Sequence, residues 1–325
     1  MHPNPLDKIP VGRTGLRVTR IGFGTSSLGD MPDTYGYSVD AERARETVRA
    51  IFAGPVNLID TSRNYGFGRS EERIGEVIRE RGGLPAGFVI STKLDRDMDT
   101  GRFDAAQARR SLEESLTALN LDRIHLLHLH DPEYGVSLSE VTGPDGALAE
   151  LFRMKEQGLA EAVGLAAGNV DVMMPILRDW DFDALITHNR FTLANRNAEA
   201  MIDYAHKQGI AVLNAAPYGS GILAKGSTDY PHYVYQAASS NVLGQIRRIE
   251  ELCAKHDIPP GAAALQFSLR DQRVSATICG ISKVERIQQT LDWAAHPISE
   301  AFWAELMTLP FETGDPEATR DYRPG

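Results

Sequence analysis

Eight short apolar segments alternate with helical patterns along this chain, and no other feature narrows the possible folds as much. The segments cover residues 21–25, 57–60, 88–94, 124–130, 160–166, 183–189, 210–217 and 275–280. Continuous apolar strands joined by helices are typical of a parallel sheet that is buried on both faces. Eight such units that close on themselves predict an α/β fold, a (β/α)8 or TIM barrel.

Other segments complete the expected barrel. Residues 9–20 predict an N-terminal β-hairpin, because two β-rich arms flank Gly12 and the Thr14-Gly15 pair. Residues 219–238 are expected to form a long loop before a helix at 241–256. The 325 residues suit a single barrel domain, 1–325. Its polar C-terminal tail, 311–325, is expected to be loosely wrapped or partly disordered.

A doubly wound dinucleotide-binding fold is the main alternative architecture. That fold requires a G-x-G-x-x-G motif that opens a helix after an early strand. The glycines of GFGTSSLG, at 22–29, are spaced differently and lead into a polar loop. We therefore favour the barrel.

Charge and cysteine content restrict the possible partners. The formal net charge of −10 argues against a nucleic-acid surface or an anionic membrane and leaves a small-molecule substrate. No apolar run approaches the ~20 residues of a membrane span, and the first residues lack the pattern of a signal peptide. The two cysteines are too few for a disulfide framework, which fits a reducing cytoplasm and a cytoplasmic enzyme. The sequence leaves the oligomeric state open.

Four polar side chains stand at or just beyond the ends of three consecutive strand segments. Asp60 ends NLID, Tyr65 follows five residues later, Lys93 lies in FVISTKL, and His130 ends IHLLHLH. In a (β/α)8 barrel the chemistry lies at the C-terminal ends of the strands. We therefore expect these four side chains to meet in one active site.

The four groups suit proton transfer. A lysine ammonium within hydrogen-bond reach lowers the pKa of a tyrosine, and an aspartate beside the lysine keeps it charged. The tyrosine then acts as a general acid or base, while a neutral histidine donates a hydrogen bond to a carbonyl oxygen. The set contains no nucleophile and no metal cage, so the most plausible coupled step is hydride transfer with a nicotinamide.

Two alternative functions remain open at this point. His128 and His130 share one side of their strand, and an H-x-H pair also occurs in zinc hydrolases. We do not favour a metal site, because further histidine and aspartate strand ends are not evident. A barrel that binds a nucleotide as a sensor or accessory subunit is the other alternative.

With these motifs in hand, the chain resembles the aldo-keto reductases along nearly its whole length. The hairpin, IGFGT, D-x4-Y, the S-T-K strand end and L-x-H-D-P occur in the order of that family. The resemblance implies a barrel that binds NAD(P)H without a doubly wound fold. It also implies that Asp60, Tyr65, Lys93 and His130 form the catalytic tetrad.

Three segments resemble the D-threo-aldose 1-dehydrogenase branch of this family, which includes L-fucose, L-galactose and pyridoxal 4-dehydrogenases. They are GRTGLRVTRIGFGTSSLG, Asn189 with the RFTL that follows it, and APYGSGILAKG. This branch implies oxidation of the C1 hydroxyl of an aldose such as L-fucose, L-galactose or D-arabinose to a lactone. Pyridoxal 4-dehydrogenase and a general aldehyde or ketone reductase are the alternatives.

The resemblance also implies cofactor contacts. Thr25 is expected below the nicotinamide, PYGSGIL around the pyrophosphate, and GISKVERIQQT beside the adenosine phosphate, with Arg286 covering the adenine or its 2′-phosphate. The expected contact residues are Thr25, Asn189, Pro217, Gly219, Ser220, Gly221, Leu223, Gly280, Ser282, Arg286 and Gln289.

Four positions depart from the pattern of many family members. Ala166-Ala167 replaces Ser-Asn, His188 or Asn189 replaces a glutamine, Ala215 replaces a stacking tyrosine, and Gly280 replaces a lysine that often pairs with the 2′-phosphate. The loss of that lysine favours NAD, or use of both NAD and NADP, although Lys283 is a possible substitute.

Overall fold

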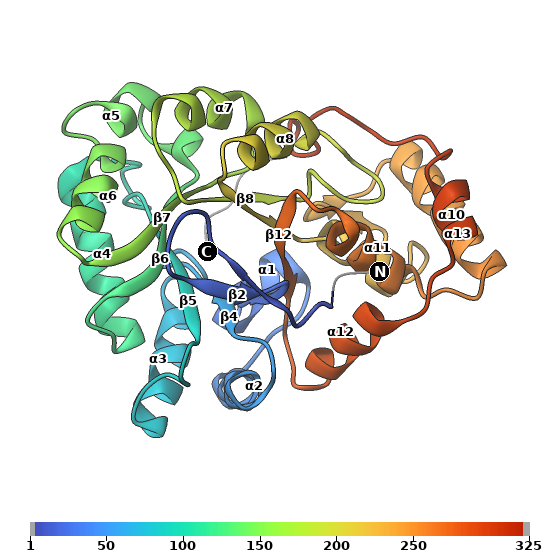
Figure 1. The fold of residues 1–325 in the computed structure, drawn as a ribbon, viewed down its shortest axis with the longest axis horizontal. Coiled ribbons are helices and arrows are strands. Elements are labelled where there is room, and N and C mark those ends of the chain that lie inside the picture. The colour runs from blue at the N-terminus through green and yellow to red at the C-terminus, as the bar shows by residue number, and fades with distance from the viewer. Residues whose placement is uncertain (1–3, 321–325) are drawn as a thin grey trace.

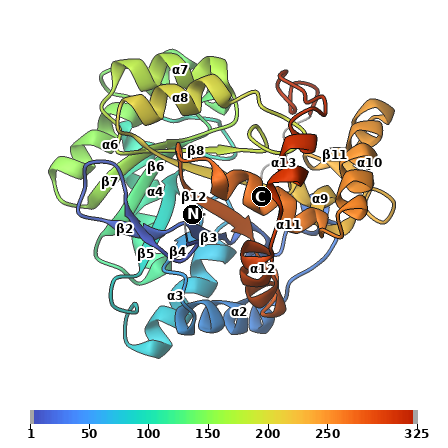
Figure 2. The same ribbon diagram turned by 45° about the vertical axis from the view of Figure 1, so that its right-hand side comes forward.

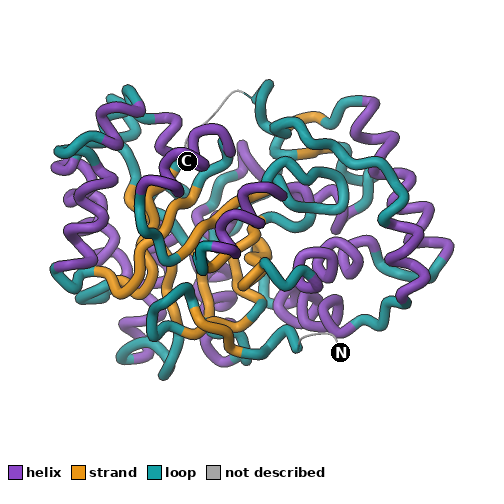
Figure 3. Tube along the Cα trace, turned by 45° about the horizontal axis from the view of Figure 1, so that its top comes forward, coloured by secondary structure: helices purple, strands orange, loops and turns teal. Residues whose placement is uncertain are grey.

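The computed structural model describes residues 4–320, and its centre is a closed barrel of eight parallel strands. The strand order around the barrel is β12-β3-β4-β5-β6-β7-β8-β9. Figures 1 and 3 show these strands enclosed by helices. The predicted (β/α)8 fold is therefore confirmed. The barrel strands are β3 (Ile21–Gly24), β4 (Leu58–Asp60), β5 (Val89–Leu94), β6 (Ile124–His130), β7 (Ala160–Ala166), β8 (Ala184–His188), β9 (Ala211–Ala215) and β12 (Val274–Gly280).

Helices follow the strands and cover the outside of the barrel (Figure 1). Asp40 and Asp104 begin two of them by accepting hydrogen bonds from backbone amides three residues later, both at 2.9 Å. The longer helices are α2 (Ala41–Ala53), α3 (Arg69–Arg81), α4 (Ala105–Leu119), α6 (Ala147–Glu156), α7 (Val170–Asp179), α8 (Glu199–Lys207), α10 (Ser240–Lys255), α11 (Pro260–Arg270), α12 (Glu285–Ala295) and α13 (Glu300–Leu306), and the short ones are α1 (Pro32–Tyr35), α5 (Leu138–Thr142) and α9 (Ile222–Lys225).

The alternation of side chains along each strand separates two apolar layers. Leu58, Val89 and Leu126 belong to a cluster inside the barrel. Their neighbours Ile59, Ile90 and Leu127 pack in a second cluster with residues of the surrounding helices. Because strand side chains alternate with a period of two, positions two and four residues beyond the inward-facing ones also point into the barrel. This parity directs Asp60, Lys93 and His130 towards its C-terminal mouth.

The N-terminal hairpin closes the other end of the barrel. Strands β1 (Lys8–Pro10) and β2 (Arg17–Thr19) pair in antiparallel register, as predicted. Val11, Leu16 and Val18 of the hairpin are buried in the same cluster as the inward-facing strand residues. The dark blue hairpin of Figure 1 thus seals the barrel end opposite the strand termini that carry the polar groups.

The expected loop at 219–238 contains more structure than predicted. It forms a 3-10 turn (Gly219–Gly221), α9 and a small hairpin of β10 (His232–Tyr233) and β11 (Gln236–Ala237). The two linking residues, Val234 and Tyr235, have positive φ angles of 51° and 62°. Such a turn normally carries Asn or Gly, so the sequence contained no signal for it.

The tail after α13 is held against the barrel as far as the structure describes it (Figure 2). Arg190, whose side chain is 2% exposed, forms ion pairs with Asp315 at 2.5 Å and Glu317 at 2.8 Å. The backbone amide of Glu312 donates to the carbonyl of Ala194 at 2.9 Å. Residues 311–320 are therefore docked rather than loose, and 321–325 lie outside the described residues. Within the described residues, no helix has the length and apolar character needed to cross a membrane.

Candidate active site

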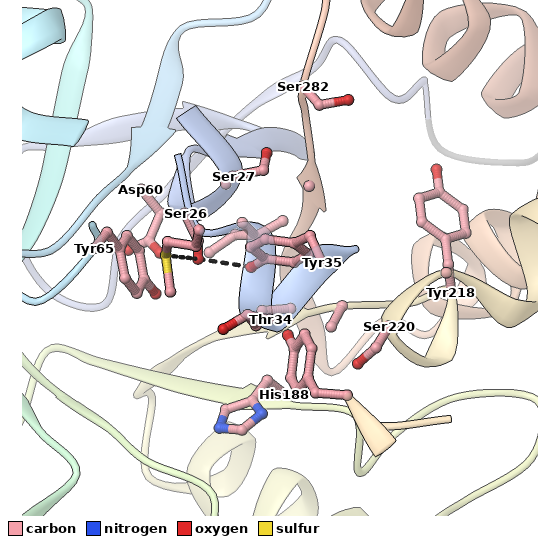
Figure 4. Close-up of a pocket in the computed structure, with 18 of the residues that line it drawn as sticks. Ser26, Ser27, Thr34, Tyr35, Asp60, Tyr65, His188, Tyr218, Ser220 and Ser282 are labelled. Atoms are coloured by element: carbon pink, nitrogen blue, oxygen red, sulfur yellow. Dashed lines mark hydrogen bonds between the residues drawn. The ribbon is translucent and has the colours of Figure 1, made fainter. Parts of the chain in front are cut away.

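A cavity of about 440 Å³ opens at the C-terminal ends of the barrel strands. All four predicted catalytic side chains line it: Asp60, Tyr65, Lys93 and His130. In Figure 4, Asp60 and Tyr65 lie on the left and Tyr218 and Ser220 on the right, with Tyr35 between them. The cavity is therefore elongated, with the four polar groups gathered at one end.

Asp60 and Lys93 form a buried ion pair at this end. The Lys93 Nζ atom lies 2.8 and 3.0 Å from the two carboxylate oxygens of Asp60 and 2.5 Å from the carbonyl oxygen of Thr61. Both side chains are at most 5% exposed. Ser91 also donates to Asp60 Oδ1, at 2.8 Å. The ammonium is thus fixed by three acceptors on the barrel wall.

Tyr65 lies against this ammonium. The Nζ atom of Lys93 is 4.7 Å from the centre of the Tyr65 ring. The loop that carries Tyr65 turns at Gly66, which has a φ of 63°. A Cβ atom on Gly66 would lie 2.0 Å from the carbonyl oxygen of Gly29, so only glycine permits this close packing. The turn holds the phenol over the lysine.

The electrostatics of Tyr65 differ from the expectation. Burial raises the pKa of Tyr65 well above its ordinary value, and the negative charge of Asp60 adds to the rise. Lys93 does not offset these effects, because its charge is already paired with Asp60. Burial and the charge of Asp60 thus oppose the predicted lowering of this pKa, and the phenol of Tyr65 is neutral.

His130 is fixed by a residue that sequence reasoning missed. Its Nδ1 atom lies 2.5 Å from Oδ1 of Asp95, the residue directly after β5. Its Nε2 atom lies 3.6 Å from Oδ2 of Asp131, and the ring centres of His130 and Tyr65 are 6.1 Å apart. Burial by itself lowers the pKa of His130, but the carboxylates of Asp131 and Asp95 together raise it. These carboxylates thus favour the protonated form of a histidine that we expected to be neutral.

His128 has a different environment from His130. It is fully buried inside the barrel, where its Nδ1 atom lies 3.4 Å from the hydroxyl of Ser91. Burial lowers the pKa of His128 well below its ordinary value. In residues 4–320, no group of three or more His, Cys, Asp or Glu side chains is arranged to hold a metal ion.

Six of the eleven predicted cofactor-binding residues line the cavity: Ser220, Gly221, Gly280, Ser282, Arg286 and Gln289. Thr25 and Asn189 are instead fully buried behind it. Thr25 donates to the backbone carbonyl of Asp60 at 3.0 Å, and the side-chain oxygen of Asn189 accepts from Ser220 at 3.1 Å. Those two residues therefore support the cavity wall. Pro217, Gly219 and Leu223 are likewise not among the residues that line it.

The substituted family positions form part of the cavity lining. Ala166, Ala167 and Ala215 line it together with Gly24 and Gly280. These side chains are small or absent, and they stand at or beside the ends of β7, β9, β3 and β12. Three of the departures noted in the sequence thus place small residues in this part of the cavity wall.

The residues at the far end of the cavity suit a dinucleotide. Lys225, Lys283 and Arg286 line this end, and within the described part of the chain none of them forms an ion pair with a carboxylate. Arg286 instead donates to Gln289. Cations without carboxylate partners, beside the glycine-rich turn at Gly219–Gly221, are the groups that phosphates require.

Aromatic residues form the wall between the two ends. The rings of Tyr35 and Tyr235 meet edge to face at 5.9 Å, and Tyr35 shares a 2.6 Å hydrogen bond with Ser26. Arg320 of the docked tail lies 4.7 Å from the Tyr235 ring and also lines the cavity. Neither Tyr35 nor Arg320 carried a signal in the sequence.

Comparisons with known proteins agree with this geometry. The model of the aldo/keto reductase family matches residues 20–309. Pyridoxal 4-dehydrogenase of Microbacterium luteolum is 27% identical over 94% of this chain and 98% of its own length. D-threo-aldose 1-dehydrogenase of a Pseudomonas species is also 27% identical, over 90% and 94%. The solved holo form of an aldo-keto reductase from Bacillus halodurans has a TM-score of 0.75 at 18% identity and covers 97% of this chain and 99% of its own. That last likeness concerns the fold alone.

Proposed function

This chain belongs to the aldo/keto reductase family and is an oxidoreductase acting on CH–OH groups, and we propose that it oxidises the C1 hydroxyl of an aldose to a lactone. L-Fucose, L-galactose and D-arabinose are the sugars that we favour. The observation that carries this proposal is the meeting of Tyr65, the Asp60–Lys93 pair and His130 at one end of a single cavity. The D-threo-aldose 1-dehydrogenase relative supports the choice of substrate.

The proposed mechanism divides the reaction between the chain and its cofactor. When bound, an oxidised nicotinamide would supply the acceptor for the hydride from C1 of the sugar, and its positive charge would favour the phenolate of Tyr65. Tyr65 takes the proton of the C1 hydroxyl as the C–H electron pair leaves, and the C1–O double bond of the lactone forms. His130 donates a hydrogen bond to the same oxygen, and Lys93 holds the phenol in place.

We propose that the cofactor is either NAD or NADP. The lysine missing at Gly280 favours NAD, but Lys283 and Arg286 form a cationic surface at the far end of the cavity. Such a surface accommodates the extra charge of a 2′-phosphate. The structure thus supports use of both nucleotides more than it supports a strict preference for NAD.

Replacing Lys283 with Ala tests this cofactor proposal. We expect the Kd for NADP⁺ to rise about tenfold, because one charged contact to phosphate is worth roughly 1.4 kcal/mol. The Kd for NAD⁺ should change by less than about twofold, since NAD lacks the 2′-phosphate. Titration of intrinsic fluorescence measures both constants, and Lys255→Ala, at an exposed lysine that pairs with Glu305, is the matched control. Equal losses for the two nucleotides would show that Lys283 does not discriminate between them.

Pyridoxal 4-dehydrogenase activity is the second candidate function. The pyridoxal 4-dehydrogenase relative covers 94% of this chain. The Tyr35 and Tyr235 rings, which meet edge to face, also offer an aromatic surface against which a pyridine ring can pack. A third proposal, a nucleotide-binding accessory protein, predicts tight nucleotide binding with negligible turnover.

A spectrophotometric screen at about 340 nm, where reduced nicotinamide absorbs, separates these proposals. NAD⁺ and NADP⁺ are each paired with L-fucose, L-galactose, D-arabinose and pyridoxal. Turnover that is fastest with one of the aldoses supports the leading proposal, whereas a preference for pyridoxal supports the second. Absence of turnover with every pair, despite tight nucleotide binding, favours the accessory role.

A further inference from the structure

Asp95 is a buried carboxylate that no part of the proposed mechanism uses. It is 3% exposed and accepts three hydrogen bonds: from His130 Nδ1 at 2.5 Å, from the Ser62 hydroxyl at 2.6 Å and from the Asn64 amide at 2.9 Å. Burial alone would raise the pKa of Asp95, but the charge of His130 and these hydrogen bonds hold it below its ordinary value. Asp95 thus remains ionised next to the histidine.

The contact with Asp95 decides how His130 is presented to the cavity. Its Nδ1 atom is occupied by Asp95, so Nε2 is the ring nitrogen that remains for another partner. The main cavity is lined by His130 and Asp131 but not by Asp95. Asp95 borders a separate cavity of about 250 Å³ between the loop after β4 and α4. It therefore acts through His130 and does not reach a substrate.

The charges around His130 favour a proton on its ring. Two carboxylates face it: Asp95, which follows β5, and Asp131, the residue directly after His130. Lys93 is the nearby cation, and its charge is paired with Asp60. The remaining titratable neighbours are the phenol of Tyr65, 6.1 Å away between ring centres, and His128, which burial keeps neutral. Two negative charges thus act on one imidazole.

We propose that Asp95 is a positioning residue that keeps His130 protonated at neutral pH, so that Nε2 presents a charged donor to the substrate oxygen. The catalytic part of this inference rests on the proposed function. A charged donor binds an oxygen more strongly as negative charge develops on it than a neutral imidazole does. Hydride transfer in either direction places negative charge on the substrate oxygen. In oxidation this oxygen gives its proton to Tyr65, and in reduction it takes a proton from Tyr65.

Nuclear magnetic resonance of the full-length protein tests the protonation of His130 without any need for turnover. The ring nitrogens are labelled with ¹⁵N, and the His130 signal is assigned by its loss in H130Q. We expect the titration midpoint of His130 in the wild type to lie above about 7, and so above the ordinary value of about 6.5 for histidine. In D95N the midpoint should fall by at least about one pH unit. In D99N, which changes an exposed aspartate of the same loop, His130 should titrate as it does in the wild type.

A wild-type midpoint below about 7 overturns the proposal whether or not D95N folds, because most of the His130 rings would then be neutral at neutral pH. An unchanged midpoint in folded D95N also overturns it, because Asp95 then contributes nothing to the proton on His130.

Kinetics in the carbonyl-reducing direction test the consequence for the reaction. We expect D95N to lower kcat roughly tenfold with little change in KM, because a charged hydrogen bond to the transition state is replaced by a neutral one. The alkaline limb of the pH profile should move to lower pH, since loss of the His130 proton then occurs earlier. An equal fall in kcat at every pH, with no shift of the limb, would contradict the proposal. If the wild-type protein turns over no substrate, the proposed function fails, and the resonance experiment still decides the role of Asp95.

Discussion

Tyr65→Phe is expected to lower kcat by about 10²- to 10⁴-fold, the usual contribution of a positioned general acid or base. The substitution removes the hydroxyl that exchanges a proton with the substrate and leaves the ring that packs against Lys93. The Kd for the nucleotide should change by less than about twofold, because the cations at the far end of the cavity are untouched. Steady-state kinetics and fluorescence titration measure the two quantities.

Tyr134→Phe is the matched control for that experiment. Tyr134 is 38% exposed and lies outside the cavity lining, so loss of its hydroxyl should leave kcat nearly unchanged. If Tyr65→Phe retains wild-type turnover, another group must exchange the proton, and the proposed role of Tyr65 is wrong. If both variants lose activity equally, the effect is not specific to the active site.

The fold and the position of the site followed from local periodicity. Alternating strands and helices indicated the barrel, and the positions of Asp60, Lys93 and His130 at or near strand ends placed them at its C-terminal mouth. These features depend on residues close together in the chain. For that reason the sequence predicted which side chains would meet at the mouth of the barrel.

Features that depend on distant contacts were not predictable. The ion pairs of Arg190 with Asp315 and Glu317 join positions more than 120 residues apart, with no motif to link them. The pairing of Asp95 with His130 depends on the neighbouring ends of β5 and β6. A lone aspartate after a strand is usually solvated, so nothing in the sequence marked this one.

The prediction of a lowered pKa for Tyr65 failed for a physical reason. The expectation counted the positive charge of Lys93 as acting on the phenol, although it also placed an aspartate beside the lysine. In the structure Asp60 holds that charge at 2.8 Å, and burial then dominates the pKa of the tyrosine. The phenolate thus needs a further positive charge in the cavity, and an oxidised nicotinamide would supply it. Proton transfer by Tyr65 would thus depend on occupancy of the cofactor site.

Lys93→Met is expected to affect both activity and folding. It leaves the buried carboxylate of Asp60 without its partner, which should lower the free energy of unfolding by about 3–5 kcal/mol. It should also lower kcat strongly, because Tyr65 loses the cation that contacts its ring. Urea denaturation followed by circular dichroism measures the first effect, and steady-state kinetics measures the second.

The double variant Asp60→Asn/Lys93→Met distinguishes these two roles of the lysine. Removing both charges eliminates the uncompensated carboxylate, so the double variant should regain much of the lost stability while remaining inactive. Lys207→Met makes the same substitution in an exposed pair with Asp203 and should leave both stability and activity almost unchanged. A Lys93→Met protein as stable as the wild type would mean that Asp60 is neutralised in another way. In that case the ion pair with Asp60 would not be the interaction that holds the Lys93 ammonium against Tyr65.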